Sequence, residues 1–316
     1  MDGMQQFQDA EVSSSTAPPQ RSAVQQVRSA VKRMASGSLL PLMQRAGRAY
    51  VGGATPQDGL IVARRLASEQ RPSTLGMWET PEYTARQVVD EYLTGIQCLA
   101  DSGLDAYLSI KPPALRFDCA LAIELATAAQ ARGVCLHLDS HGPEAADPSC
   151  ALLEAMLPKL SSRHLGTTLP GRWTRSVSDA GWAVDHGLQV RVVKGQWPDP
   201  ADPHRDLRAG FLEVIDRLAG RARHVQVATH DVPLAAEAVG RLRKAGTPCE
   251  LELLFGMPMT RSLRWADASG VRARIYVPYG KGYLPSAVDQ LRRNPRLIWW
   301  IVRSLVTARG STSGAR

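Results

Sequence analysis

The chain has 316 residues, of which 44% are hydrophobic and 22% charged, as expected for one or two folded domains. Lysine and arginine outnumber aspartate and glutamate by 38 to 30, giving a formal charge of +8 that favours anionic partners. The basic residues are dispersed, without a helix-turn-helix or zinc-finger pattern, so nucleic-acid binding is the least favoured class of function.

The cysteine pattern predicts reduced thiols and a cytoplasmic location. Their number is odd, their spacing is wide and contains no CxxC pair, and a chain of this length needs no disulfides to build a core. We also expect neither a secretory signal nor a membrane-spanning segment, because no apolar run is long enough. The five residues are Cys98, Cys119, Cys135, Cys150 and Cys249.

The first third of the chain is predicted to be mostly helical. Residues 1–22 are rich in Ser, Gln and Pro without periodicity, which indicates disorder. Residues 23–100 are expected to form a helical arm that leads into the next domain, with helical spacing already between Ala23 and Tyr50. Thr55 followed by Pro56 is typical of a helix start, and a further helix is expected from about Pro81.

Short apolar segments then alternate with amphipathic helices such as 118–132 and 207–219. This alternation predicts an α/β fold with a parallel sheet, and eight strand candidates favour a closed (β/α)8 barrel of the TIM type over residues 101–308, with a flexible tail at 309–316. A doubly wound open sheet is the alternative, although no GxGxxG follows a strand. The candidates are TLGMW (74–78), AYLSIK (106–111), VCLHLD (134–139), LGTTLP (165–170), QVRVVKG (189–195), HVQVATH (224–230), CELELLFG (249–256) and RARIYVPYG (272–280).

The segment QVRVVKGQW (189–197) places cations at the end of a predicted strand. Arg191 lies within the strand, and Lys194 follows it beside Gly195, a residue that lets the backbone approach a ligand closely. Such a strand end suits an anionic or electron-accepting ligand at the mouth of a parallel barrel. Alternatively, the arginine and the lysine only pair with acidic residues.

Five segments in one order resemble the flavin-dependent proline dehydrogenase family: YLSIK, RVVKGQW, VATHD, LLFGM and IYVPYG. The resemblance extends upstream to AYVGGATPQDGLIVARRL and TLGMWE, and therefore covers roughly residues 45–300. It implies a distorted (βα)8 barrel that holds FAD at the carboxyl ends of the strands. Family members remove a hydride from the carbon next to the ring nitrogen of proline and pass electrons to a quinone or another acceptor.

The same resemblance implies roles for individual residues. Arg191 matches an arginine beside the reactive nitrogen of the flavin, where a fixed cation stabilises the reduced ring. Lys111 and Tyr276 match residues near the substrate and, with Arg191, are the predicted catalytic residues. The other predicted cofactor contacts are Val193, Lys194, Gly195, Trp197, Thr229 and His230, and the predicted substrate contacts are Lys111, His137, Leu254, Tyr276, Asp289 and Gln290. No metal site is predicted.

The chain also departs from the family where the family binds the carboxylate of proline. With Pro285 and Pro295 as anchors, Asp289 and Gln290 occupy the positions of an arginine pair, and Ser286 occupies that of a tyrosine. A paired guanidinium fork recognises carboxylates strongly, so its loss disfavours free proline as the substrate. Alternatively, the helix has shifted in register and the neighbouring pair Arg292 and Arg293 replaces the fork.

Three further departures affect the cofactor and substrate ends of the site. Pro170 replaces a glutamine that hydrogen-bonds the flavin, and proline has no donor to offer. His137 replaces an acidic residue, although Asp139 is close by, and Trp197 replaces a tyrosine.

The function predicted from these features is an FAD-dependent, proline dehydrogenase-like oxidoreductase. Its substrate would be a cyclic amine or a proline-like compound with a masked carboxylate, and its partner a quinone or another electron acceptor. The alternative is a non-catalytic barrel of the same ancestry that acts as a binding or regulatory protein. Residues 297–306 are apolar on nearly all sides, which predicts a closing helix against the barrel and at most a peripheral membrane contact.

Overall fold

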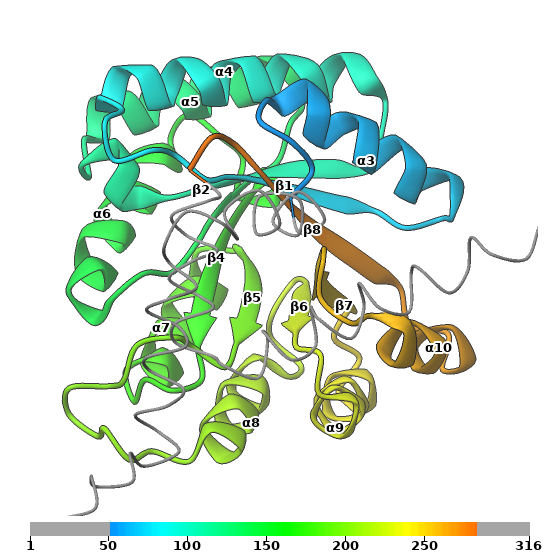
Figure 1. Ribbon diagram of the computed structural model, residues 1–316. Coiled ribbons are helices and arrows are strands. Elements are labelled where there is room, and N and C mark those ends of the chain that lie inside the picture. The colour runs from blue at the N-terminus through cyan, green and yellow to red at the C-terminus, as the bar shows by residue number, and fades with distance from the viewer. Residues whose placement is uncertain (1–50, 283–316) are drawn as a thin grey trace, which may run out of the picture. The chain divides into compact units, whose positions relative to one another are not determined.

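A computed structural model describes residues 51–282. Eight parallel strands form a closed barrel in the order of the sequence, and the helices surround it as an outer layer (Figure 1). The predicted (β/α)8 fold is therefore confirmed, and the open sheet is excluded. The strands are β1 (Ser73–Met77), β2 (Ala106–Ile110), β3 (Leu136–Leu138), β4 (Leu165–Pro170), β5 (Gln189–Val193), β6 (Val225–Ala228), β7 (Cys249–Leu254) and β8 (Ala273–Tyr279).

Seven of the eight predicted segments contain one of these strands, and β1 begins one residue before the predicted segment 74–78. Strand β1 belongs to the closed barrel, so the barrel includes residues before 101. The α-helices are α3 (Pro56–Ser68), α4 (Ala85–Ser102), α5 (Cys119–Arg132), α6 (Ala146–Met156), α7 (Ser176–Asp185), α8 (Leu207–Leu218), α9 (Val232–Lys244) and α10 (Thr260–Ala268), and the short 3-10 helices are η1 (Pro112–Leu115), η2 (Pro143–Ala145) and η3 (Ser162–His164).

Helix starts follow the capping residues. The Thr55 hydroxyl accepts a hydrogen bond from Asp58 N at 3.2 Å, and the Asp58 carboxylate accepts one from Thr55 N at 3.0 Å, which caps α3. The helix expected from about Pro81 begins instead at Ala85. The side chains of Thr84 and Gln87 form the same reciprocal cap there and fix the start of α4 four residues later.

The two faces of the strands differ in chemistry. Residues that point outward are apolar and pack against the helices, because alternate residues of a strand face opposite sides of the sheet. Many of the residues that point inward are polar or charged, unlike the branched aliphatic side chains that usually fill such a barrel, and they include Thr74, Ser109, His137, Arg191, Gln226, Glu250, Glu252 and Arg274. The fully buried outward residues include Leu75, Leu108, Ile110, Leu136, Val190, Val192, Val225, Val227, Leu251, Leu253, Ile275 and Val277.

All five cysteines are free thiols, as predicted. Within residues 51–282, no helix combines the length and the apolar character needed to cross a membrane. Several predictions lie outside the described residues: the helical spacing of 23–50, the substrate contacts Asp289 and Gln290, and the apolar segment 297–306.

Candidate active site at the barrel mouth

Arg191 on β5 lies inside the barrel and is 3% exposed. Its Nε and Nη2 donate to the two carboxylate oxygens of Glu252 on β7, at 2.6 and 3.1 Å. Its Nη1 donates to Asp139 Oδ1 at 2.6 Å, just after β3. These contacts join strands that are not neighbours in the sheet, so they cross the interior. Burial by itself disfavours the charged guanidinium, but Glu252 and the other anionic neighbours outweigh this and raise the pKa of Arg191.

Asp139 accepts hydrogen bonds on both carboxylate oxygens. Tyr276 Oη donates to Oδ2 at 2.7 Å, and Ser109 Oγ donates to Oδ1 at 2.6 Å. Burial raises the pKa of Tyr276 well above its ordinary value, and the nearby Asp139 raises it further, so the phenol stays protonated and donates. Gly76 makes room for this phenol, because a Cβ at Gly76 would lie 1.9 Å from Tyr276 Oη. We call Asp139, Arg191, Glu252 and Tyr276, with Thr74, Ser109 and Thr168, the upper cluster.

A second group of charges lies one layer deeper, toward the amino ends of the strands. Arg274 on β8 donates from Nε to Glu250 Oε1 at 2.6 Å, and its guanidinium lies 4.5 Å from the ring centroid of Tyr107. Tyr107 in turn stacks on His137 with ring centroids 5.8 Å apart. We call these four residues the lower cluster. His137 is 2% exposed, and its pKa is lowered well below the usual value by burial and by Arg191.

His137, a predicted substrate contact, lies deeper in the barrel than Asp139. His137 lies below Asp139 in the interior, and Gly166 leaves space for it, because a Cβ there would be 2.2 Å from His137 Nδ1. Asp139 is the more accessible of the two, with a side chain that is 17% exposed. The geometry therefore favours Asp139 over His137 as the group that faces the barrel mouth.

The upper cluster carries one positive charge against two negative charges. The other ion pairs at this end of the barrel are balanced: Lys111 Nζ lies 2.9 Å from Glu79 Oε2, and Lys194 Nζ lies 2.9 Å from Asp231 Oδ2. The upper cluster itself therefore has a surplus of one negative charge, centred on Asp139. Such a field attracts cations and repels free carboxylates.

The predicted cofactor contacts at the ends of β5 and β6 are brought together by the fold. Lys194 is about two-fifths exposed and pairs with Asp231, whose pKa is lowered by that hydrogen bond. His230 Nε2 accepts from Leu254 N at 3.0 Å, and its Nδ1 lies 3.3 Å from Pro258 O. These partners assign the proton to Nδ1, and burial lowers the pKa of His230, which keeps the ring neutral.

The remaining predicted cofactor contacts pack against or bond to other residues of the barrel rim. Gly195 has a φ of 93°, which favours glycine, and a Cβ there would meet Pro170 Cβ at 2.8 Å. Thr229 is 7% exposed, and its hydroxyl accepts from Asp231 N at 3.2 Å. Trp197 is half-buried and stacks on His141 with centroids 6.0 Å apart. Val193 and Leu254 end their strands at this same rim.

The donor set matches one end of FAD better than the other. Lys194 and Arg172 supply cations beside the ends of β4 and β5. Among residues 51–282, Arg172 donates only from Nη1, to Gln196 O at 3.1 Å. Both cations fit phosphate oxygens. At the ring end, Arg191 already binds two carboxylates and Pro170 has no donor, so the side-chain contacts that the resemblance implies are weakened.

Sequence reasoning missed Glu252, although a signal was present. CELELLFG alternates polar and apolar residues, so Glu250 and Glu252 point to one face of β7 and their neighbours to the other. Arg191 pairs with Glu252 and Asp139 and also donates to the hydroxyls of Ser109 and Thr168, both at 3.3 Å. Residues 51–282 hold no cluster of three or more His, Cys, Asp or Glu side chains that could bind a metal ion.

The chain is distantly similar in sequence to proline dehydrogenases. It is 24% identical over 277 residues to proline dehydrogenase 1 of Bacillus subtilis subsp. natto, an alignment that covers 82% of this chain and 90% of that protein. It is 23% identical over 180 residues to proline dehydrogenase of Deinococcus radiodurans, covering 55% of this chain and 57% of the relative. No family model matches the sequence.

Solved structures share the fold. Proline utilization A from Bdellovibrio bacteriovorus, inactivated by N-propargylglycine, superposes with a TM-score of 0.70 at 16% identity. The match covers 86% of this chain but only 35% of that one, so the present chain corresponds to about a third of its length. Proline utilization A of Bradyrhizobium japonicum gives a TM-score of 0.60 at 19% identity, over 72% of this chain and 29% of the other.

Proposed function

We propose, from this distant relationship to the proline dehydrogenases, that the chain is a flavin-dependent oxidoreductase for a cyclic secondary amine without a free carboxylate. A proline ester or a proline-like acyl group belongs to the same class, because its carboxylate is masked. FAD, when bound, would accept the hydride that leaves the carbon next to nitrogen.

The single observation that carries this proposal is the surplus negative charge of the upper cluster. Arg191 is neutralised by Glu252, and Asp139 remains as a carboxylate at the accessible end of the network. A protonated amine would be attracted to Asp139, whereas the carboxylate of free proline would be repelled. Asp289 and Gln290, in place of an arginine pair, point the same way from the sequence.

The residues of this chain would then divide the work as follows. Asp139 would bind the nitrogen of the substrate, and Tyr276 and Ser109 would hold the Asp139 carboxylate in place. Arg191 would act as a positioning residue, because it joins Asp139 to the buried Glu252. Lys194 and Arg172 would hold the pyrophosphate of the cofactor.

The absorption spectrum of the purified chain is the first test, followed by anaerobic reduction with pyrrolidine, proline methyl ester and proline. We expect flavin bands, and we expect pyrrolidine and the ester to bleach them at least about tenfold faster than proline, a difference of about 1.4 kcal/mol. Asp139→Asn should slow the two amines while leaving the flavin bands in place. Faster bleaching by proline would contradict the proposed substrate class.

A non-catalytic barrel is the second candidate, and one observation favours it. Arg191 is buried and binds two carboxylates, and Pro170 offers no donor, so the ring end of a flavin would gain little from either. A colourless protein that also fails to bind added FAD would favour this candidate over the enzyme.

A further inference from the structure

The end of the barrel opposite the mouth has an uneven distribution of charge. Residues 51–282 contain 26 basic and 26 acidic residues, so this part of the chain has no formal net charge. The loops before β4, β5, β6 and β7, together with the last residues of α7, α8 and α9, nevertheless contain eight basic residues and two acidic ones. These segments are 157–164, 185–188, 216–224 and 241–248.

Six of these cations are exposed and form no ion pair within residues 51–282. The two acidic residues do little to offset them, because Asp216 is bound by Arg241 at 2.6 Å and only Asp185 is left without an ion pair in the described segments. We call the six exposed cations the basic face. They are Lys159, Arg163, Arg217, Arg221, Arg223 and Lys244.

The fold brings the loops of the basic face together. Gln189 Nε2 donates to Arg163 O at 2.8 Å, and Gln226 Nε2 donates to Gln189 Oε1 at 3.2 Å, which links the loop before β4 to β6. Gly220 N donates to Thr247 Oγ1 at 2.6 Å, which links the loops before β6 and β7. Because β4, β5, β6 and β7 are successive neighbours in the barrel, the basic face forms one continuous surface.

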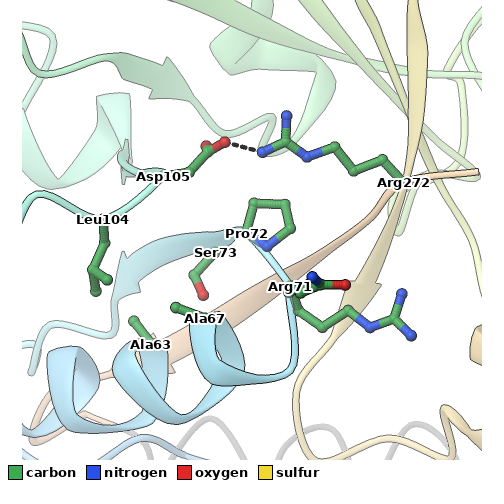
Figure 2. A pocket seen from close by; sticks show the side chains of 9 residues that line it. Ala63, Ala67, Arg71, Pro72, Ser73, Leu104, Asp105 and Arg272 are labelled. Atoms are coloured by element: carbon green, nitrogen blue, oxygen red, sulfur yellow. Dashed lines mark hydrogen bonds and ion pairs between the residues drawn. The ribbon is translucent and has the colours of Figure 1, made fainter.

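The other half of the same barrel end, around β8, β1 and β2, is balanced by ion pairs. Arg272 binds Asp105 there (Figure 2), and Arg71 binds Asp267 at 2.6 Å. The excess of positive charge is therefore confined to the half of this end that lies below β4 to β7.

Stabilisation of helix ends accounts for only part of this excess. Cations are favourable in the last turn of a helix, and Arg217 and Lys244 lie in the last turns of α8 and α9. The other four members of the basic face lie in loops beyond the helices, where the helix dipole has little effect. Their mutual repulsion is unfavourable in the isolated chain, and an anionic partner would relieve it.

The composition of the chain narrows the choice of anion. Residues 1–50 contain six basic and three acidic residues, and residues 283–316 contain six and one, so like charge disfavours both as occupants of the basic face. An anionic membrane is disfavoured because stable anchoring needs an apolar group as well as charge. The exposed large hydrophobic residues of the described part, Ile61 on α3 and Leu254 at the carboxyl end of β7, lie outside these segments.

A nucleic acid is also disfavoured by the shape and composition of the basic face. Its segments are short loops and helix ends, which present neither a helix nor a two-stranded ribbon to a groove. They contain no Phe, Tyr or Trp on which an unpaired base could stack.

We propose that the basic face docks an acidic, extended segment of another protein. Guanidinium groups bind carboxylates in a paired fork, and four of the six cations are arginines. A flexible chain rich in Glu and Asp can bring its carboxylates one by one to cations on different loops, which a rigid polyanion cannot do. The surface lies at the opposite end of the barrel from the mouth and does not depend on the proposed oxidation.

Fluorescence anisotropy of a fluorescein-labelled oligoglutamate peptide, titrated with the full chain, tests the proposal. We expect micromolar affinity at low salt and at least about tenfold weaker binding at physiological ionic strength, because exposed charges are screened. The double variant Arg221→Glu with Arg223→Glu should weaken binding at least about tenfold. The matched control is Arg261→Glu with Arg264→Glu, which reverses two exposed arginines of α10 that also form no ion pair among the described residues and should leave the affinity unchanged.

Lys159→Glu with Lys244→Glu provides a second test on two other loops, and circular dichroism shows that each variant is folded. The proposal is overturned if the wild-type chain does not bind the peptide, or if the reversals on the basic face and on α10 weaken binding equally. Tighter binding of a short DNA duplex, or of vesicles that contain phosphatidylglycerol, at the same salt concentration would assign the surface to another class of partner and would also overturn it.

Discussion

The upper and lower clusters of the barrel interior use the same chemistry with different results. Each pairs a buried arginine with a glutamate of β7, Arg191 with Glu252 above and Arg274 with Glu250 below. Above, the second partner is Asp139, which is partly exposed and leaves a surplus negative charge. Below, the second partner is Asp105, which is shared with Arg272, so the charges balance.

This difference shows how one barrel can separate stability from binding. Buried ion pairs contribute little net stability, because desolvation opposes the attraction, but breaking one of them is costly. The charges of the lower cluster are balanced through Asp105 and Arg272, whose side chains are about half exposed, and these contacts tie β8 to β7 and to the loop before β2. The upper cluster satisfies Arg191 but leaves Asp139 facing the mouth, where a cation can complete the balance.

The largest effect should come from removing a buried arginine. Arg191→Met and Arg274→Met should each cost about 3–5 kcal/mol of unfolding free energy, because the carboxylates left behind lose their partner. Urea unfolding measures this. Combining Arg191→Met with Glu252→Gln should recover part of the loss. If Arg191→Met costs under about 1 kcal/mol, the buried pair is not formed as described.

The stability of the protein should fall in acid, because His224 is half-buried near the amino ends of the strands. Burial and the positive Arg274 lower the pKa of His224 to about 4. The unfolded chain binds a proton near pH 6.5 and the folded chain does not, so stability should fall as the pH drops from about 6.5 to about 4, by at most about 3 kcal/mol from this residue. His224→Gln should flatten the pH dependence of urea unfolding in that window. An unchanged slope would contradict the assignment.

Substitutions of Thr74 and Ser73, which are neighbours on β1, should have smaller and different effects on the free energy of unfolding. Thr74 Oγ1 donates to Glu252 Oε1 at 2.9 Å, whereas Ser73 Oγ has no partner among the described residues. Thr74→Val should therefore cost about 1–3 kcal/mol, and Ser73→Ala should change stability by less than about 0.5 kcal/mol. Thermal and urea unfolding of both variants measure the contrast. Equal losses would show that Ser73 Oγ does have a partner in solution.

The smallest effect on stability is expected at the rim. Lys194 and Asp231 form a pair in which both side chains are nearly two-fifths exposed, and such pairs contribute about 0–1 kcal/mol. Lys194→Gln should thus leave the melting temperature almost unchanged and weaken FAD binding, which fluorescence titration measures. Unchanged FAD affinity would remove Lys194 from the predicted cofactor contacts, and a large loss of stability would contradict the rim position.

Local patterns were sufficient to predict the frame of the molecule. Apolar residues recur at every second position of a strand, as in Val190 and Val192, and the capping Thr55 marks the start of α3. These signals lie within a few neighbours along the chain, so eight strands and their order followed from the sequence. The start of α4 was misplaced, because the choice between Pro81 and Ala85 depends on the reciprocal hydrogen bonds between the side chains and backbone N–H groups of Thr84 and Gln87.

What the sequence determined by itself is the barrel, its strand order and the presence of Arg191 and Lys194 at one strand end. What only the tertiary structure decided is how the charges of the interior combine. Arg191 and Glu252 lie on two strands and Asp139 directly follows a third, with Arg191 separated from Asp139 by 52 positions and from Glu252 by 61. Their pairing depends on the closure of the barrel, because only then do the inward faces of non-neighbouring strands meet across a buried interior where each charge needs a partner.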